Sequence, residues 1–451
     1  MSLTPYPGRH PAQVVRMGLA GLVLLCSSAV WGQAPIVSTH SVSPEFPPAT
    51  TYGSTMYRND DPRTHYETRR FMPIDVTAPT EVLLQQLWLT ENQVGAYSAE
   101  LVPELRELGA ALFADGQYPD AIDTYRRAIH LLRVNEGLYT PSQTGMVEQL
   151  IEAYYEIGDF IAADDQQQYL FRVRKKHLKP GDPEMLEAVE QLADWHRTAY
   201  LSQLDRFRYP RIVDLIDLYA DTAKRVAEDE GETSRNQLPY LEGKLRTEYL
   251  LSVYPGESEE PLQVEAAQRD NADLPDLKKL RFIAFRNDNY RHGLATLRQM
   301  RKIIESDPNS TPREIAEVMV KQGDWYQWHR RYAQAIRLYR SAWNAMDGQP
   351  GAESWRTANF SNPLELPSEV VFQPGRMPLR LYHDAEVHAR FAVTRHGEAH
   401  DIEILSPDRT DNQPAVTRGY KYLRDMRFRP RLEDGVVVTA APIERTYNIR
   451  Y

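Results

Sequence analysis

Four histidines crowd one short stretch near the end of the chain, where imidazole nitrogens could bind a metal ion. They are His383, His388, His396 and His400. His396 and His400 could face each other across a turn, and neutral imidazole is a common zinc ligand. The spacing fixes no carboxylate and no third ligand, and the stretch is not an HExxH helix. We therefore interpret these histidines as exposed turn residues and predict no metal, no cofactor and no catalytic residue.

A basic stripe follows the histidines. It consists of Arg418, Lys421, Arg424, Arg427, Arg429 and Arg431. The first three recur every three residues on a predicted helix, and only Asp425 interrupts the stripe with an acidic charge. Such a stripe could dock an acidic partner or the acidic helical part of the same chain. The alternative is a solvated helix face. We keep Arg418, Lys421, Arg424, Arg427 and Arg429 as candidate partner-binding residues.

Aromatic side chains are dense in a third region. Trp325, Tyr326, Trp328, Tyr332, Tyr339 and Trp343 lie within 19 residues. We expect most of them to fill the space between helices. The helical repeat described below does not require Trp325 or Trp328. These two are therefore our candidates for rigid anchors that line a peptide-binding groove.

The elements that would position these residues are mainly helical. From about Thr80 the apolar residues recur at helical spacing. The pairs Leu108-Gly109, Leu150-Ile151 and Leu192-Ala193 each lie 42 residues after the pair before. A fixed period of this length predicts stacked helix pairs, with small residues where two helices cross closely and large apolar residues in the gaps.

The repeat resembles the tetratricopeptide repeat (TPR), in its extended 42-residue class. The first unit carries Gly109, Leu112, Ala121, Tyr125 and Ala128 at the family's offsets, and the last carries Gly323, Tyr326, Tyr332, Ala335, Tyr339 and Ala342. The resemblance implies an α-solenoid that binds a protein or peptide. We place TPR-like repeats at residues 81–253 and 277–350, separated by an acidic loop at 254–276.

The last part of the chain changes character after a proline-rich stretch, which we interpret as a linker over residues 351–379. Residues 385–393 and 399–406 alternate in polarity around Gly397, which predicts a β-hairpin. A helical stretch from Gln413 to Met426 and a strand over 441–451 follow.

With the segment MRFRPRLEDG, residues 380–451 resemble the TonB C-terminal domain. The resemblance implies a strand–strand–helix–strand module whose last strand can accept a strand from a partner. It also makes a homodimer possible through strand exchange. The predicted fold class is therefore mainly α, with a small α+β domain at the C-terminus.

The beginning of the chain predicts export. Arg9 and Arg16 precede an apolar run, so residues 1–32 are typical of a signal peptide that is cleaved after Gly32. An uncleaved anchor and a lipid attached to Cys26 are the alternatives. Residues 33–80 are rich in Ser, Thr and Pro and predict a disordered linker.

The amino-acid composition excludes some kinds of site and disfavours one class of ligand. Cys26 is the only cysteine, so disulfides and cysteine metal sites are excluded, and the net charge of −10 disfavours nucleic-acid binding. We expect a non-enzymatic adaptor in the bacterial periplasm that binds envelope proteins or peptides, with membrane association only if the signal is retained or lipidated. The alternative is a membrane-anchored energy transducer similar to TonB, which acts on outer-membrane receptors.

Overall fold

The computed structural model describes residues 56–58, 71–202, 204–205, 207–254, 277–367, 371–372, 384–405 and 413–450. The expected signal peptide, most of the expected linker at 33–80 and all but the first residue of the acidic loop at 254–276 lie outside these residues. Within the described part, no helix is long and apolar enough to span a bilayer.

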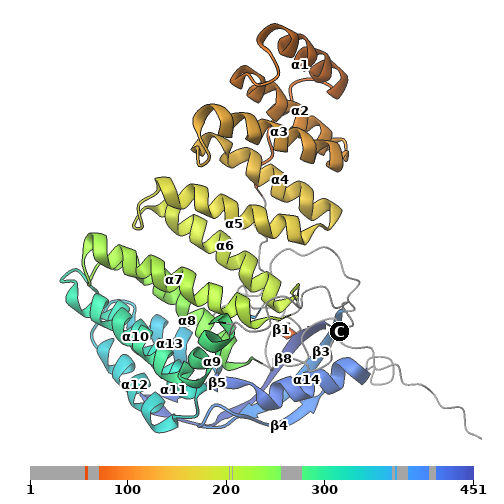
Figure 1. Ribbon diagram of the computed structural model, residues 1–451. Helices are drawn as coiled ribbons and strands as arrows, with labels where there is room; N and C mark the ends of the chain where they lie inside the picture. The colour runs from red at the N-terminus through yellow and green to blue at the C-terminus, as the bar shows by residue number, and fades with distance from the viewer. Residues whose placement is uncertain are drawn as a thin grey trace, which may run out of the picture. The chain divides into compact units, whose positions relative to one another are not determined.

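Helices in antiparallel pairs make up most of the chain (Figure 1). Short 3₁₀ turns at Ala99–Leu101, Pro141–Gln143 and Arg235–Gln237 lead into three of them. The helices are α1 (Thr80–Val94), α2 (Val102–Ala114), α3 (Tyr118–Glu136), α4 (Thr144–Ile157), α5 (Phe160–His177), α6 (Pro183–Leu201), α7 (Tyr209–Glu230), α8 (Leu238–Ser252), α9 (Leu277–Asn287), α10 (Asn289–Ser306), α11 (Pro312–Trp328), α12 (Tyr332–Ala345) and α13 (Ala352–Phe360).

The repeat residues identified in the sequence pack where two helices of a pair cross, as predicted. In the first pair, a Cβ on Gly109 of α2 would lie 2.6 Å from the ring of Tyr125 on α3. Gly323 of α11 meets the ring of Tyr339 on α12 in the same way. A glycine lets the two helices approach closely at the crossing, and the tyrosine fills the space beside it. The predicted TPR-like helix pairs are confirmed.

Local signals set where the helices begin and end. Thr311 and Glu314 form a reciprocal capping box at the start of α11. Gly158 adopts a left-handed conformation (φ 74°) and ends α4, so that the chain can turn back into α5.

The C-terminal part, called the tail below, is a twisted sheet covered by one helix. Its elements are β3 (Asp384–Val393), β4 (Ala399–Ile404), α14 (Gln413–Asp425), β5 (Arg427–Arg429), β6 (Leu432–Glu433), β7 (Val436–Val437) and β8 (Ala440–Arg450). The predicted order of strand, strand, helix and strand is present. The four-stranded sheet has the order β1-β8-β3-β4, with β8 antiparallel to β3.

One strand of this sheet comes from the opposite end of the chain. Residues Met56–Arg58 form β1, which pairs antiparallel with residues 447–449 of β8. This short strand lies inside the stretch for which the sequence predicted a disordered linker. The outer edge of β8, where the TonB resemblance implied a partner strand, carries a strand of the same chain.

The prediction of a proline-rich linker over residues 351–379 is wrong for its first half. Helix α13 lies there, followed by β2 (Leu364–Leu366), which pairs antiparallel with β5 of the tail. Trp355, Phe360 and Leu366 are buried, and this burial orders a segment that its prolines made look irregular.

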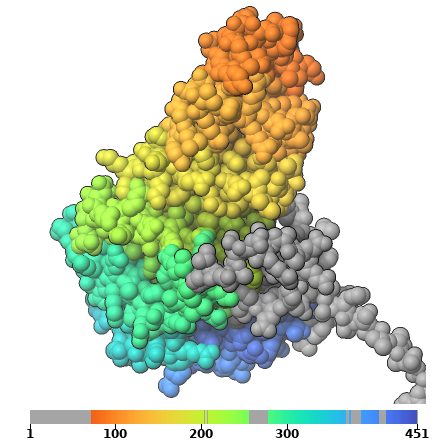
Figure 2. Space-filling view, viewed as in Figure 1, coloured from red at the N-terminus to blue at the C-terminus, as the bar shows by residue number. Residues whose placement is uncertain are grey.

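The tail and the last repeats share one hydrophobic core. Tyr249 of α8 and Trp325 of α11 belong to the same buried cluster as Phe391, Phe428 and Tyr447 of the tail. Figure 2 shows the blue surface of the tail directly against the cyan surface of the last helices. The tail is therefore an extension of the solenoid's core, not a module on a tether.

Candidate functional site

Trp325, a predicted peptide anchor, lies in the core. Its side chain is 0% exposed, and its indole N–H donates to the Tyr290 carbonyl at 3.1 Å. The ring lies edge-on to Tyr249 and packs over Gly293, where a Cβ would clash with it. The prediction that Trp325 lines an open groove is wrong, because this large ring fills the space between α10 and α11.

Trp328, the second predicted anchor, is partly buried. Its indole N–H donates to Ser252 Oγ at 2.8 Å, and its ring lies edge-on to Tyr249 at 5.3 Å. On another side it stacks with Phe372 at 6.4 Å. These contacts make Trp328 a packing residue between α8 and the segment that leads to the tail, so the prediction of an open anchor is corrected here too.

Two histidines in the interior predict a loss of stability at mildly acidic pH. Burial lowers the pKa of His196 to about 4 and that of His329 to about 4. The unfolded imidazole titrates near 6.5, so between these values the unfolded state binds more protons. The stabilisation is complete above about pH 6.5 and is lost as the pH falls toward 4.

We expect the free energy of unfolding to drop by about 1 kcal/mol per histidine between pH 7 and pH 5.5. Urea unfolding at the two pH values measures this drop. The variant His329→Asn keeps only one of the two buried histidines, so its drop in the free energy of unfolding should be about half of the wild-type drop. An equal drop in both proteins would contradict the contribution of His329.

Arg429 of the basic stripe is buried and pairs with the last repeat. The side chain is 3% exposed, and Nε and Nη2 donate to the two carboxylate oxygens of Asp324 at 2.8 and 2.6 Å. Nη1 donates to Asn359 Oδ1 at 2.9 Å, and the Tyr339 hydroxyl donates to Asp324 at 2.9 Å. The stripe is predicted to dock either an acidic partner or the helical part of its own chain. Arg429 binds its own chain, so it is not available to a partner.

The other residues of the basic stripe differ in their exposure to solvent. Arg427 is partly buried and donates to the carbonyls of Asp425 and Met426 at 2.9 and 3.1 Å. Lys421 and Arg424 are exposed on α14, where Arg424 pairs with the neighbouring Asp425 at 3.1 Å. Arg418 is half-buried. The role of the stripe in partner binding stays a prediction for the exposed members only.

The histidines of the hairpin point to different partners. His388 Nδ1 lies 2.9 Å from Thr446 Oγ1, and His400 Nδ1 lies 2.8 Å from Asp401. The ring of His396 stacks on Tyr332 of α12 at 4.9 Å, so it is part of the contact between the tail and the repeats. His383 lies outside the described residues. Among the residues that are described, no group of three ligating side chains could hold a metal ion.

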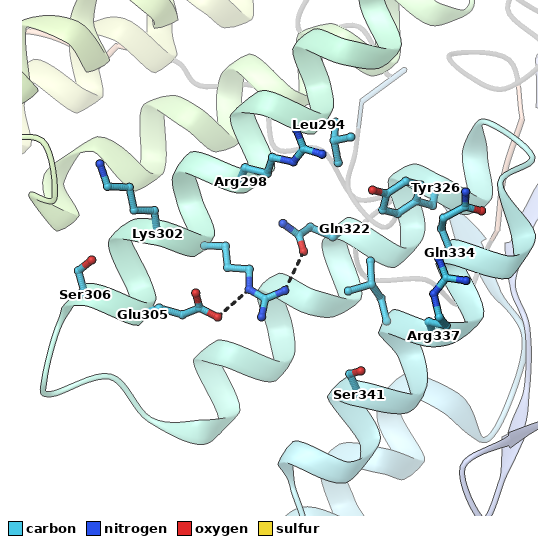
Figure 3. A pocket seen from close by; sticks show the side chains of 12 residues that line it. Leu294, Arg298, Lys302, Glu305, Ser306, Gln322, Tyr326, Gln334, Arg337 and Ser341 are labelled. Atoms are coloured by element: carbon cyan, nitrogen blue, oxygen red, sulfur yellow. Dashed lines mark hydrogen bonds and ion pairs between the residues drawn. The ribbon is translucent and has the colours of Figure 1, made fainter.

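A concave site lies elsewhere, between α10 and α12 with α11 at its base (Figure 3). We call it the cationic groove. Its volume is about 620 Å³. It is lined by Leu294, Arg298, Arg301, Lys302, Glu305, Ser306, Gln322, Tyr326, Gln334, Arg337, Leu338 and Ser341.

Most of the charge in the cationic groove is uncompensated. Arg301 Nε donates to Glu305 at 2.6 Å, and Arg301 also reaches Gln322 at 3.5 Å (Figure 3). Arg298, Lys302 and Arg337 are exposed, and within the described residues no carboxylate pairs with them. Three free cations therefore surround a single neutralised pair, in a chain whose net charge is −10.

The cationic groove also offers apolar and aromatic surface. Leu294 and Leu338 come from its two walls, and the half-buried Tyr326 lies at its base. On α10 the lining residues recur at helical spacing, from Leu294 through Arg298 and Lys302 to Glu305. That periodicity could have revealed one wall from sequence. Only the fold brings the second wall, which α12 forms, opposite the first.

Comparisons with known proteins give structural neighbours of low similarity. No protein-family model and no curated protein matches the chain. A Podosopora anserina kinesin-light-chain-like protein with nearly identical TPR-like repeats is 14% identical, with 51% of this chain and 88% of that one covered and a TM-score of 0.31. Its Q17M variant is 13% identical, with coverages of 55% and 95% and the same TM-score. BtubC (BKLC) from P. vanneervenii is 12% identical, with coverages of 62% and 89% and a TM-score of 0.30.

Proposed function

We propose that this protein is a non-enzymatic interaction adaptor that binds an acidic segment of a partner protein in the cationic groove. The observation that carries the proposal is the group of three exposed cations, Arg298, Lys302 and Arg337, which no described carboxylate neutralises. They come from α10 and α12, which both pack on α11, so the positions of the three residues on the helices are set before a ligand arrives. Preorganisation of this kind lowers the entropic cost of binding.

The chemistry of the groove favours a peptide over other anions. Glutamate and aspartate side chains would meet the three cations, while Tyr326, Leu294 and Leu338 offer contacts to apolar or aromatic side chains between them. Aromatic and arginine side chains dominate binding energy at many protein interfaces. A nucleic acid is a poorer ligand, because the surrounding chain is net acidic and would repel an extended phosphate backbone.

Location and partners belong to the same proposal. The signal-like residues 1–32 support export to the periplasm, where the partner would be an envelope protein with an acidic segment. The strand order of the tail is compatible with the TonB resemblance. The energy-transducer alternative would require residues 1–32 to remain in place as a membrane anchor.

A charge-reversal experiment tests the proposal. The probe is a fluorescein-labelled twelve-residue peptide with the sequence Glu-Leu-Glu-Tyr repeated three times. We expect it to bind the wild-type protein, with an affinity that falls as NaCl is raised, because salt screens exposed charges. The triple variant Arg298→Glu, Lys302→Glu and Arg337→Glu should bind at least tenfold more weakly in fluorescence anisotropy.

A matched control changes the same amount of charge elsewhere. Arg126→Glu, Lys224→Glu and Arg291→Glu alter three exposed cations outside the groove, so this triple variant should bind the peptide like the wild type. If both triple variants lost affinity for the peptide equally, the loss would result from the change in net charge and not from the groove. Equal binding by the wild type and the groove variant would rule out the groove as the site.

A further inference from the structure

The repeat also places one polar residue of each of three successive units on a second surface. Glu107, Gln149 and Gln191 lie 42 residues apart, at the same position of three successive repeats. They belong to α2, α4 and α6, which are the first helices of their pairs. Equivalent positions of stacked repeats lie in a row along the stack. We call these three residues the polar ladder.

The first two residues of the polar ladder bind the main chain of a segment that precedes α1. Gln149 Nε2 donates to the carbonyl of Met72 at 2.8 Å, and the Thr77 N–H donates to Glu107 Oε1 at 2.9 Å. The Thr77 hydroxyl also donates to Glu107, and these hydrogen bonds lower the pKa of that carboxyl group. Because main-chain groups are the same in every residue, such contacts recognise an extended backbone more than a sequence.

Apolar side chains of the same segment supply the remaining contacts. Phe71, Ile74 and Ala78 are partly buried against the core formed by α1 to α5. Met72 and Val76 point away from it and are 86% and 41% exposed. Residues 71–79 contain no regular secondary structure. They lie on the repeats as a bound peptide would, with main-chain hydrogen bonds and intermittent apolar anchors.

We propose that this helix face is a binding surface for an extended polypeptide segment, and that residues 71–79 are its resident ligand. A partner segment with apolar residues at the spacing of Phe71, Ile74 and Ala78 takes the same place when the resident segment is displaced. Gln191, the third member of the ladder, hydrogen-bonds to Gln167 and Arg174 at 3.1 and 2.7 Å. This surface is separate from the cationic groove and does not depend on the function proposed for it.

The covalent link gives the resident segment a large advantage over a free peptide. A short tether holds a ligand at an effective concentration on the order of millimolar. A free peptide at micromolar concentration therefore does not replace it in the wild-type protein. Substitutions that weaken the apolar contacts of the resident segment should offset its high effective concentration. The helix face that carries the polar ladder would then be accessible to a free peptide.

The test uses the full chain with Phe71→Asp and Ile74→Asp. The probe is a fluorescein-labelled peptide of residues 71–80, FMPIDVTAPT. We expect at least tenfold tighter binding to this double variant than to the wild type in fluorescence anisotropy. Adding Gln149→Ala should abolish the gain. The matched control is Met72→Asp with Val76→Asp, which changes exposed side chains of the same segment and should bind the peptide no better than the wild type.

Two results would overturn the proposal. The first is a folded Phe71→Asp/Ile74→Asp variant, checked by its thermal unfolding, that does not bind the peptide. The second is a gain that survives Gln149→Ala. If the double variant does not fold, hydrogen exchange in the single variant Glu107→Ala decides instead. Its Thr77 amide should exchange at least tenfold faster than in the wild type, and an unchanged rate would refute the ladder.

Discussion

Replacing Arg429 by alanine is expected to lower the free energy of unfolding by about 3–5 kcal/mol, because it leaves a buried carboxylate without its cation. Asp324 is 2% exposed and would keep only the Tyr339 hydroxyl as a described partner. The reverse change, Asp324→Ala, strands the guanidinium in the same interior and should cost a similar amount. Urea unfolding followed by circular dichroism measures both variants.

The ion pair itself should be replaceable. The double variant Arg429→Met and Asp324→Leu removes both charges, so we expect it to be more stable than either single alanine variant. Arg424→Ala is the matched control, because its pair with Asp425 is solvent-exposed, and it should change stability by less than about 1 kcal/mol. A loss at Arg429 no larger than that at Arg424 would show that the pair does not hold the tail on the repeats.

Trp325→Ala is the second change with a large expected effect. The substitution empties the space between Gly293, Tyr249 and the backbone of α10, and removes the indole that donates to the Tyr290 carbonyl. Removing a fully buried tryptophan typically costs about 3–5 kcal/mol. The midpoint of urea unfolding should therefore shift strongly, with little change in the slope of the transition.

An exposed tryptophan provides the control for this prediction. Trp88 on α1 is 65% exposed, so Trp88→Ala should change the free energy of unfolding by no more than about 0.5 kcal/mol. If Trp325 were a partner anchor outside the core, both variants would be equally stable and only partner binding would suffer. Equal stability of the two variants would thus restore the role that its sequence context suggested.

The parts of the fold that the sequence predicts are those with a local or periodic cause. The 42-residue spacing of Leu108, Leu150 and Leu192 reflects helix pairs that pack the same way each time. The alternation around Gly397 reflects a hairpin whose turn needs positive φ, and Gly397 has a φ of 69°. Each of these signals lies within one or two elements, so one sequence is enough to detect it.

The parts that it does not predict depend on contacts between distant segments. Asp324 and Arg429 are 105 residues apart, and nothing near either residue indicates the other. The buried state of Trp325 depends on contacts with α8 and α10, which are far from it in the sequence. The cationic groove needs two walls that a third helix holds apart. The sequence therefore predicts which residue types are present, but it does not predict that Trp325 and Arg429 are buried.

The shared core also changes how partner binding should be dissected. Deleting residues 380–451 would expose the face of the last repeats that Phe391 and Phe428 cover. Such a truncation would lose partners through misfolding as well as through loss of a binding surface. Point substitutions at exposed positions, such as Lys421 and Arg424 on α14, separate these two causes.

The order of the sheet also bears on how the chain is made. In the chain β8 follows β1, β3 and β4, yet in the sheet it lies between β1 and β3 and not at an edge. The hairpin of β3 and β4 cannot pair with β8 until β8 has been synthesised, whereas the N-terminal repeats can fold earlier, because each rests mainly on its neighbours. A stop codon in place of Ala440 would leave β1 and β3 without the strand that joins them. Such a chain would keep every described helix and strand before β8 and still expose the core of its tail to proteases.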